Sequence, residues 1–133
     1  MATIKHERPL SPHLQVYRWQ ITMTMSILHR ATGAVLAVGA FAVMAWLLAI
    51  ASGPEAYAQF TSLAASPVGK VALMGFAFCL IYHLLNGIRH LLWDIGYGYE
   101  IPKLYATGWT VTALTALLTA LVWYCGLAQG GGA

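Results

Sequence analysis

Hydrophobic residues are gathered into three long stretches that contain no charged side chain. They run from residue 31 to 54, from 71 to 88, and from 104 onward, with the last stretch apolar to about residue 128. A helix that crosses a bilayer needs about 20 apolar residues. The pattern therefore predicts an all-α integral membrane protein whose three transmembrane helices cover about residues 26–52, 68–93 and 104–128.

Proline marks the boundaries between these predicted helices. A Gly-Pro pair at 53–54 ends the first helix, a Ser-Pro pair at 66–67 begins the second, and an Ile-Pro pair at 101–102 separates the second from the third. Nothing in the sequence suggests an internal repeat. We therefore expect residues 1–133 to form a single membrane-anchor domain, with residues 1–25 as a cytoplasmic N-terminal segment.

Composition supports the same class of protein. Hydrophobic residues make up 59% of the chain and charged residues 8%, whereas soluble domains carry about 25% charged residues. The seven Lys and Arg residues are dispersed, which argues against a nucleic-acid partner and makes them topology signals. Cys79 and Cys125 lie in apolar stretches without a CxxC or CxxCH motif, so we predict neither a disulfide framework nor covalent haem attachment.

His83 is the principal candidate for a functional residue. It lies inside the second uncharged stretch, where an ionisable group is costly unless something binds it. Gly87, one turn away, leaves space beside the imidazole for a flat ligand, and His90 follows near the same face. Other polar residues nearby are interpreted as ordinary helix-end groups: Asn86, Arg89 and Asp94. The pattern favours ligation of a haem iron by His83; the simpler alternative is a histidine hydrogen-bonded to a neighbouring helix.

The number of deep histidines also bears on this hypothesis. His83 is the only histidine that the predicted spans place deep in the bilayer. A haem with two histidine ligands therefore could not be completed within one copy of the chain. We expect any second axial ligand to come from a partner membrane subunit.

Ser26 and Arg30 form a second candidate pair. They are spaced i, i+4 and share one helix face at the edge of the first apolar stretch. A hydroxyl beside a guanidinium can hydrogen-bond a quinone oxygen and stabilise negative charge during its reduction. The simpler alternatives are that Arg30 is an interface anchor, that Ser26 is a helix cap, and that His29 is an interfacial histidine. Spacing alone leaves these alternatives open.

Three motifs follow one another along the chain. They are Arg8-Pro9-Leu10-Ser11-Pro12-His13-Leu14, Ser26-x-x-His29-Arg30-x-Thr32-Gly33, and His83-x-x-x-Gly87-Ile88-Arg89-His90-x-x-x-Asp94-x-Gly96. In this order and spacing they resemble the cytochrome b membrane subunit of succinate dehydrogenase (succinate:quinone oxidoreductase, respiratory complex II). Each motif alone is weak, but the three together are specific, and they cover most of the chain.

The resemblance implies a complex of four different chains that links the tricarboxylic acid cycle to the respiratory chain. A flavoprotein with FAD would oxidise succinate, an iron–sulfur subunit would relay electrons, and two membrane subunits would anchor both. This chain would be a non-dehydrogenase subunit with no catalytic residue of its own. It would share one haem b with the second membrane subunit and would use ubiquinone as substrate.

The resemblance also assigns roles to single residues. His83 would be an axial ligand of the haem iron, and the helical spacing described above would then put Gly87 and His90 close to the haem. His29 and Arg30 would lie near a haem propionate. The quinone site would be lined by Ser26 and Arg30, with an apolar wall from Ile27 and Trp19.

Other functions remain open on the sequence. A fumarate reductase or another quinol-linked dehydrogenase could use the same haem subunit, and a haem-free helper or transporter subunit would leave His83 and Arg30 without a role. No cleavable targeting segment is apparent near the N-terminus. We expect a bacterial inner (cytoplasmic) membrane location in contact with lipid, with the mitochondrial inner membrane as the less favoured option.

Basic residues predict the orientation of the chain in the membrane. With the N-terminus in the cytoplasm, six basic residues fall inside and one outside. Those inside are Lys5, Arg8, Arg18, Arg30, Arg89 and Lys103, and the one outside is Lys70. An alkaline phosphatase fused to the C-terminus should therefore be active in the periplasm. An inactive phosphatase, together with an active cytoplasmic reporter at the same position, would contradict this topology.

Overall fold

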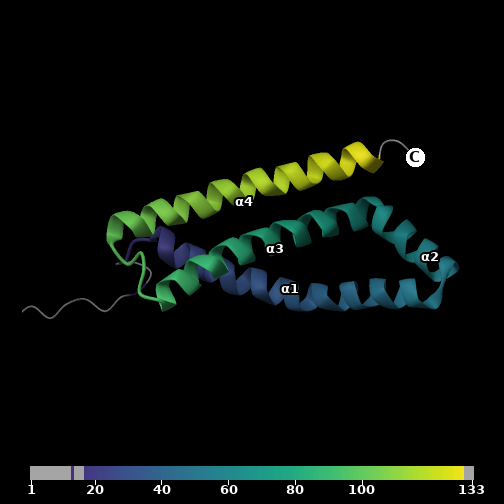
Figure 1. Cartoon of the computed structure of the whole chain (residues 1–133), viewed down its shortest axis with the longest axis horizontal. Coiled ribbons are helices and arrows are strands. Elements are labelled where there is room, and N and C mark those ends of the chain that lie inside the picture. Colours follow the sequence, from purple (N-terminus) through teal and green to yellow (C-terminus); the bar gives the residue numbers. More distant parts are fainter. Residues whose placement is uncertain (1–12, 14–16, 131–133) are drawn as a thin grey trace, which may run out of the picture.

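A computed structural model describes residue 13 and residues 17–130, which form four α-helices (Figure 1). The helices are α1 (Ile21–Ser52), α2 (Pro54–Ala65), α3 (Pro67–Asp94) and α4 (Ile101–Gly130). Among the described residues, α1, α3 and α4 are long and apolar enough to cross a membrane. The prediction of an all-α membrane protein with three transmembrane helices is confirmed. Most of the N-terminal motif at residues 8–14 lies outside the described residues.

The spanning helices extend beyond the apolar stretches that predicted them. Helix α1 begins at Ile21 rather than near residue 26, because its backbone hydrogen bonds continue through a polar first turn in which the Thr24 N–H donates to the Gln20 carbonyl (3.0 Å). Ser26 therefore lies inside α1, and its interpretation as a helix cap is wrong. Helix α4 begins at Ile101 instead of residue 104, with Pro102 in its first turn.

Helix α2 lies in the segment that the sequence analysis treated as a connection. Pro54 occupies its first turn, where a missing N–H costs nothing, and Glu55 stands near the positive end of the helix dipole. The sequence analysis did not predict helix α2, because the helix is of mixed polarity and the prediction relied on long uncharged stretches. Ser66 then caps α3 by accepting a hydrogen bond from the Gly69 N–H (3.1 Å).

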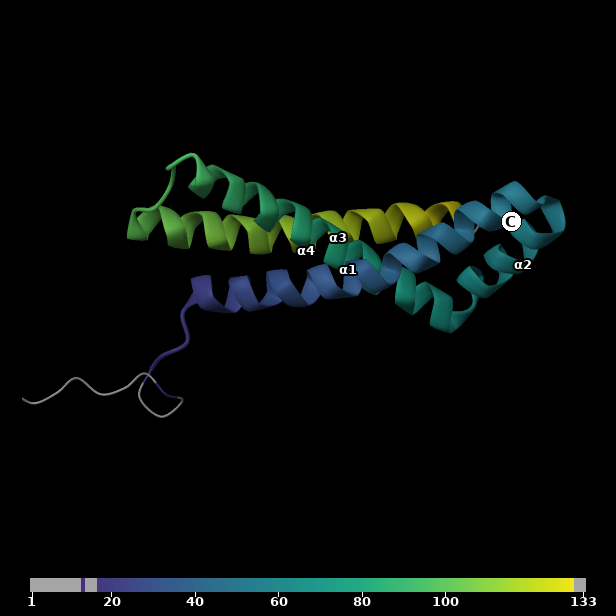
Figure 2. The ribbon, with the colours of Figure 1, turned by 90° about the horizontal axis from the view of Figure 1, so that it is seen from below.

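The three long helices pack most closely at the end where α1 and α4 begin and α3 ends (Figures 1 and 2). Met25, Tyr82 and Val111 form the buried core there, one from each helix. The Tyr82 hydroxyl donates to the Met25 carbonyl (2.9 Å). A Cβ at Gly108 would lie 3.1 Å from the Met25 sulfur, so glycine allows α4 to approach α1.

The opposite end of the bundle is more open. A cavity of about 600 Å³ lies between α1, α2 and α3 and is lined almost wholly by apolar side chains, among them Val35, Trp46, Phe60 and Phe76. Most large apolar side chains of the described residues are exposed on the isolated chain. In a bilayer these surfaces suit lipid tails and other membrane helices.

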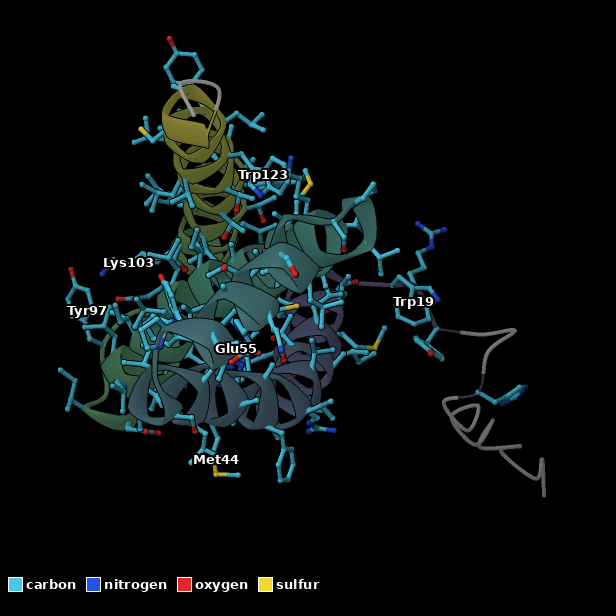
Figure 3. The ribbon with its side chains drawn as sticks, turned by 90° about the vertical axis from the view of Figure 1, so that its right-hand side faces the viewer. Trp19, Met44, Glu55, Tyr97, Lys103 and Trp123 are labelled. Atoms are coloured by element: carbon cyan, nitrogen blue, oxygen red, sulfur yellow. The ribbon has the colours of Figure 1, made fainter. Side chains whose placement is uncertain are left out.

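A short turn joins α3 to α4 beside the packed end. Lys103 donates a hydrogen bond to Glu100 (2.9 Å), which lowers the pKa of the Glu100 carboxyl below its ordinary value. The Lys103 ammonium also lies 5.3 Å from the centre of the Tyr97 ring, and both side chains project from the same edge of the molecule (Figure 3). The turn therefore gathers polar and aromatic groups at one end of the bundle, as expected for a membrane–water interface.

Candidate functional site

Three imidazoles from two helices meet at the packed end of the bundle. The rings of His29 in α1 and His83 in α3 are stacked, with centroids 3.9 Å apart and planes inclined by 5°. The His90 ring lies 5.1 Å from that of His29. The sequence motifs that contain these histidines are far apart along the chain, and the packing of α1 against α3 brings them together.

The stacking brings together two histidines that the sequence analysis had treated separately. His83 was predicted to be the only deep histidine and His29, taken alone, an interfacial one, whereas the structure places the two rings directly against each other. The two rings are unsuited to hold one metal ion together in this arrangement, because imidazole lone pairs lie in the ring plane and those of two stacked rings do not converge on one point.

The hydrogen bonds of His83 leave one ring nitrogen available. Its Nδ1 lies 3.1 Å from the carbonyl oxygen of His29 and 3.3 Å from the hydroxyl oxygen of Thr32. Since a carbonyl can only accept, these partners assign the ring proton to Nδ1. Nε2 makes no hydrogen bond within the described part of the chain and is not among its enclosed unpartnered atoms. This nitrogen has the lone pair that a metal ligand needs.

Two glycines permit the close contact around the imidazoles. A Cβ at Gly33 would lie 3.0 Å from Cε1 of His83, closer than an ordinary van der Waals contact. A Cβ at Gly87 would lie 3.7 Å from Cε1 of His29. In this packing the space beside Gly87 therefore borders His29 rather than His83, and the glycine beside the His83 ring is Gly33, which the site hypothesis did not include.

The candidate quinone residues lie near the start of α1. Ser26 is half-buried and Arg30 is exposed, one helical turn further on. Among the described residues Arg30 has no ion-pair partner, so its charge is available to a ligand. Ile27 is exposed on the same helix. Trp19 lies in the segment before α1, apart from the bundle, and its ring packs against that of Tyr17 (6.1 Å) (Figure 3).

Arg89 belongs to the interior of the bundle rather than to a helix end. Its side chain is 3% exposed. Nε donates to the Thr107 hydroxyl (3.0 Å) and an Nη donates to the Leu104 carbonyl (2.9 Å), while the guanidinium lies 4.1 Å from the centre of the Trp93 ring. Within the described residues no carboxylate pairs with it. Arg89 therefore joins α3 to α4 and keeps a positive charge inside the bundle.

Asn86 is also buried, which the sequence interpretation as a helix-end group missed. It has no exposed surface, and neither its amide nitrogen nor its amide oxygen has a hydrogen-bond partner in the described part of the chain. The burial of Asn86 and Arg89 could have been recognised from their spacing to Tyr82. Residues i, i+4 and i+7 share one helix face, and Tyr82, Asn86 and Arg89 are the buried residues of α3.

Comparison with known proteins gives consistent matches over almost the whole chain. Residues 4–122 match the family described as succinate dehydrogenase/fumarate reductase transmembrane subunit. The succinate dehydrogenase cytochrome b556 subunit of Rickettsia felis is 44% identical over 120 residues, covering 90% of this chain and 94% of the relative. That of Paracoccus denitrificans is 40% identical, covering 88% and 92%. The human mitochondrial cytochrome b560 subunit is 42% identical, covering 86% and 69%.

The Arg89 contact predicts a stability effect that a matched variant can isolate. Thr107→Val removes the hydroxyl that accepts from the buried guanidinium, and a lost hydrogen bond to a charged group costs about 1.5–3 kcal/mol. The thermal unfolding midpoint of the purified membrane complex should fall by a few degrees. Thr110→Val is the control, because within the described residues the exposed Thr110 hydroxyl bonds to the Ala106 carbonyl of its own helix (2.9 Å) and to no other helix. Equal midpoints for the two variants would exclude a stabilising role for this contact.

Proposed function

Because the chain belongs to the family of succinate dehydrogenase/fumarate reductase transmembrane subunits, we propose that it binds haem b through His83 and helps to deliver electrons to ubiquinone. Its role as a membrane-anchoring subunit of succinate dehydrogenase follows from the family and the relatives. The observation that carries the haem proposal is the His83 imidazole, whose Nδ1 is hydrogen-bonded to α1 while Nε2 has no hydrogen-bond partner within the described residues.

Haem b supplies one-electron chemistry when it is bound. The contribution of this chain is to present the Nε2 lone pair of His83 and to provide polar groups for the propionates. Nδ1 of His29 is buried and has no partner within the described residues, so a ligand group would satisfy it. We assign the propionate end of the haem to His29 and Arg30, with His90 and Gly87 beside it.

The second axial ligand is proposed to come from a second membrane subunit. Among the described residues His29 has its ring stacked on that of His83, so the lone pairs of the two rings would not converge on one iron. Much of the apolar surface of the described helices is exposed, and this leaves room for further membrane helices. The haem would then lie between two chains and hold them together.

Ubiquinone is proposed to bind at the start of α1. Ser26 and Arg30 would hydrogen-bond its carbonyl oxygen, and Ile27 and Trp19 would contribute the apolar wall. We propose that this end faces the cytoplasm, as the distribution of basic residues predicts. Electrons would arrive there from an iron–sulfur subunit whose flavoprotein partner, with FAD, oxidises succinate.

The chain is a multi-pass membrane protein, and we propose the bacterial inner membrane as its location. The family description includes fumarate reductases, but the named relatives are succinate dehydrogenase subunits from bacteria and mitochondria. These names favour succinate oxidation as the physiological direction. Succinate-driven quinone reduction, compared with quinol-driven fumarate reduction in the purified complex, tests that choice; faster fumarate reduction would reverse it.

Substitution of His83 tests the haem proposal. In purified His83→Ala complex, the low-spin haem bands of the reduced-minus-oxidised spectrum should be lost or strongly altered, because an axial nitrogen is removed. Leu84→Ala is a suitable control, since it shortens an exposed neighbour on the same helix turn. An unchanged spectrum in the His83→Ala complex would rule out this residue as a ligand.

Substitution of Ser26 and Arg30 tests the quinone site. Ser26→Ala and Arg30→Leu should each weaken quinone reduction roughly 10- to 150-fold, since a lost hydrogen bond involving a charged group costs about 1.5–3 kcal/mol. Succinate oxidation by a soluble artificial acceptor should stay close to wild type.

Ser52→Ala and Lys70→Leu provide matched controls at the other end of the bundle, where both side chains are exposed. Normal quinone kinetics in both Ser26→Ala and Arg30→Leu would remove these residues from the site. If succinate oxidation by the artificial acceptor fell as much as quinone reduction, the variants would have failed to assemble.

A further inference from the structure

Among the described residues, Thr32 and Thr107 are the threonines whose hydroxyls also contact a side chain on another helix. The hydroxyls of Thr24, Thr110 and Thr112 each donate to a carbonyl four residues earlier and make no other hydrogen bond within the described residues. Thr32 does the same toward Leu28 (2.8 Å), but its oxygen also lies 3.3 Å from Nδ1 of His83 on another helix. Its side chain is 5% exposed, so water cannot easily replace that partner.

The hydrogen-bonding capacity of this hydroxyl determines its role. A hydroxyl has one proton, and that of Thr32 is directed to the carbonyls of Leu28 (2.8 Å) and His29 (3.0 Å). Its lone pairs remain to accept from the Nδ1–H of His83. The carbonyl of His29 accepts from the same N–H at 3.1 Å. Two acceptors on α1 therefore converge on one imidazole proton.

We infer that Thr32 is a positioning residue for His83, and the inference rests on the proposed ligation of haem by that histidine. Hydrogen bonds to the far nitrogen of a ligating imidazole fix its tautomer and ring orientation and make the other nitrogen more basic. Thr32 thereby strengthens electron donation from Nε2 and favours the oxidised iron. Its hydroxyl therefore lowers the reduction potential of the haem without being a ligand of the iron.

Gly33 lies beside the neighbouring atom of the same ring. A Cβ there would lie 3.0 Å from Cε1 of His83, so glycine leaves the room that the imidazole needs. Two successive residues of α1 thus accommodate the imidazole, Thr32 by hydrogen bonding at Nδ1 and Gly33 by leaving space at Cε1. Thr32 and Gly33, which are adjacent in the sequence motif, therefore have different roles.

The experiment compares Thr32→Val, Thr32→Ser and Thr24→Val in the purified complex by redox titration and electron paramagnetic resonance of the haem. Thr32→Val keeps the shape and removes the hydroxyl. It should retain haem but raise the ratio of reduced to oxidised haem roughly two- to tenfold at a fixed potential, as expected for a net hydrogen bond of about 0.5–1.5 kcal/mol. That corresponds to a rise of about 20–60 mV. Thr32→Ser should restore the wild-type potential, and Thr24→Val should leave it unchanged.

The outcomes separate this inference from the haem proposal. If His83→Ala abolishes the low-spin spectrum while Thr32→Val has the wild-type potential and resonance, the positioning role is overturned and the ligand assignment stands. If His83→Ala keeps the spectrum, the haem proposal itself fails. Should the Thr32→Val complex not assemble, Thr32→Ala compared with Thr32→Ser tests the same loss of a hydroxyl.

Discussion

Two hydrogen bonds from neighbouring residues of α3 fix the position of α1. Tyr82 donates to the carbonyl of Met25 (2.9 Å) and His83 donates to that of His29 (3.1 Å), one helical turn apart. A helix carbonyl has a second lone pair, so it can accept these bonds without losing its own. In a bilayer the two donors would otherwise lack partners. The stacked imidazoles and the Met25 core follow from the register that these bonds set.

Polar contacts are distributed unevenly along the bundle. His83, Tyr82 and Arg89 all bond across helices near one end, whereas the other end contains an apolar cavity of about 600 Å³. Apolar packing has little directional preference, while hydrogen bonds and a buried charge tolerate only a few arrangements. The end that carries the candidate site is therefore the end where the helices are held in one geometry.

Much of the architecture and part of the site could be predicted from the sequence. The long uncharged stretches were sufficient for three spans, and the isolation of His83 in one of them identified it as a candidate. Helix α2 could not be recognised in the same way, because it is short and of mixed polarity. The contact between His29 and His83 could not be predicted either, because hydropathy locates apolar segments along the chain but does not say which residues of two helices meet.

The residues that the sequence analysis missed are those whose role depends on another helix. Arg89 appears as a topology signal until Leu104 and Thr107 are placed beside it. Thr32 appears as an ordinary helical threonine until the His83 ring is brought to its hydroxyl. Spacing along one helix defines a face, but it does not say which residue of a different helix meets that face.

The contact between α1 and the His83 ring has a consequence for how the membrane complex can be observed. With His83 as the iron ligand, both acceptors of its Nδ1 proton belong to α1, while the ligand belongs to α3. Any sliding of one helix against the other changes these distances and so changes the electron density at Nε2. The haem absorption bands would therefore act as an intrinsic optical probe of helix displacement. Movements caused by quinone, by lipid composition or by a neighbouring subunit could be followed without an added label.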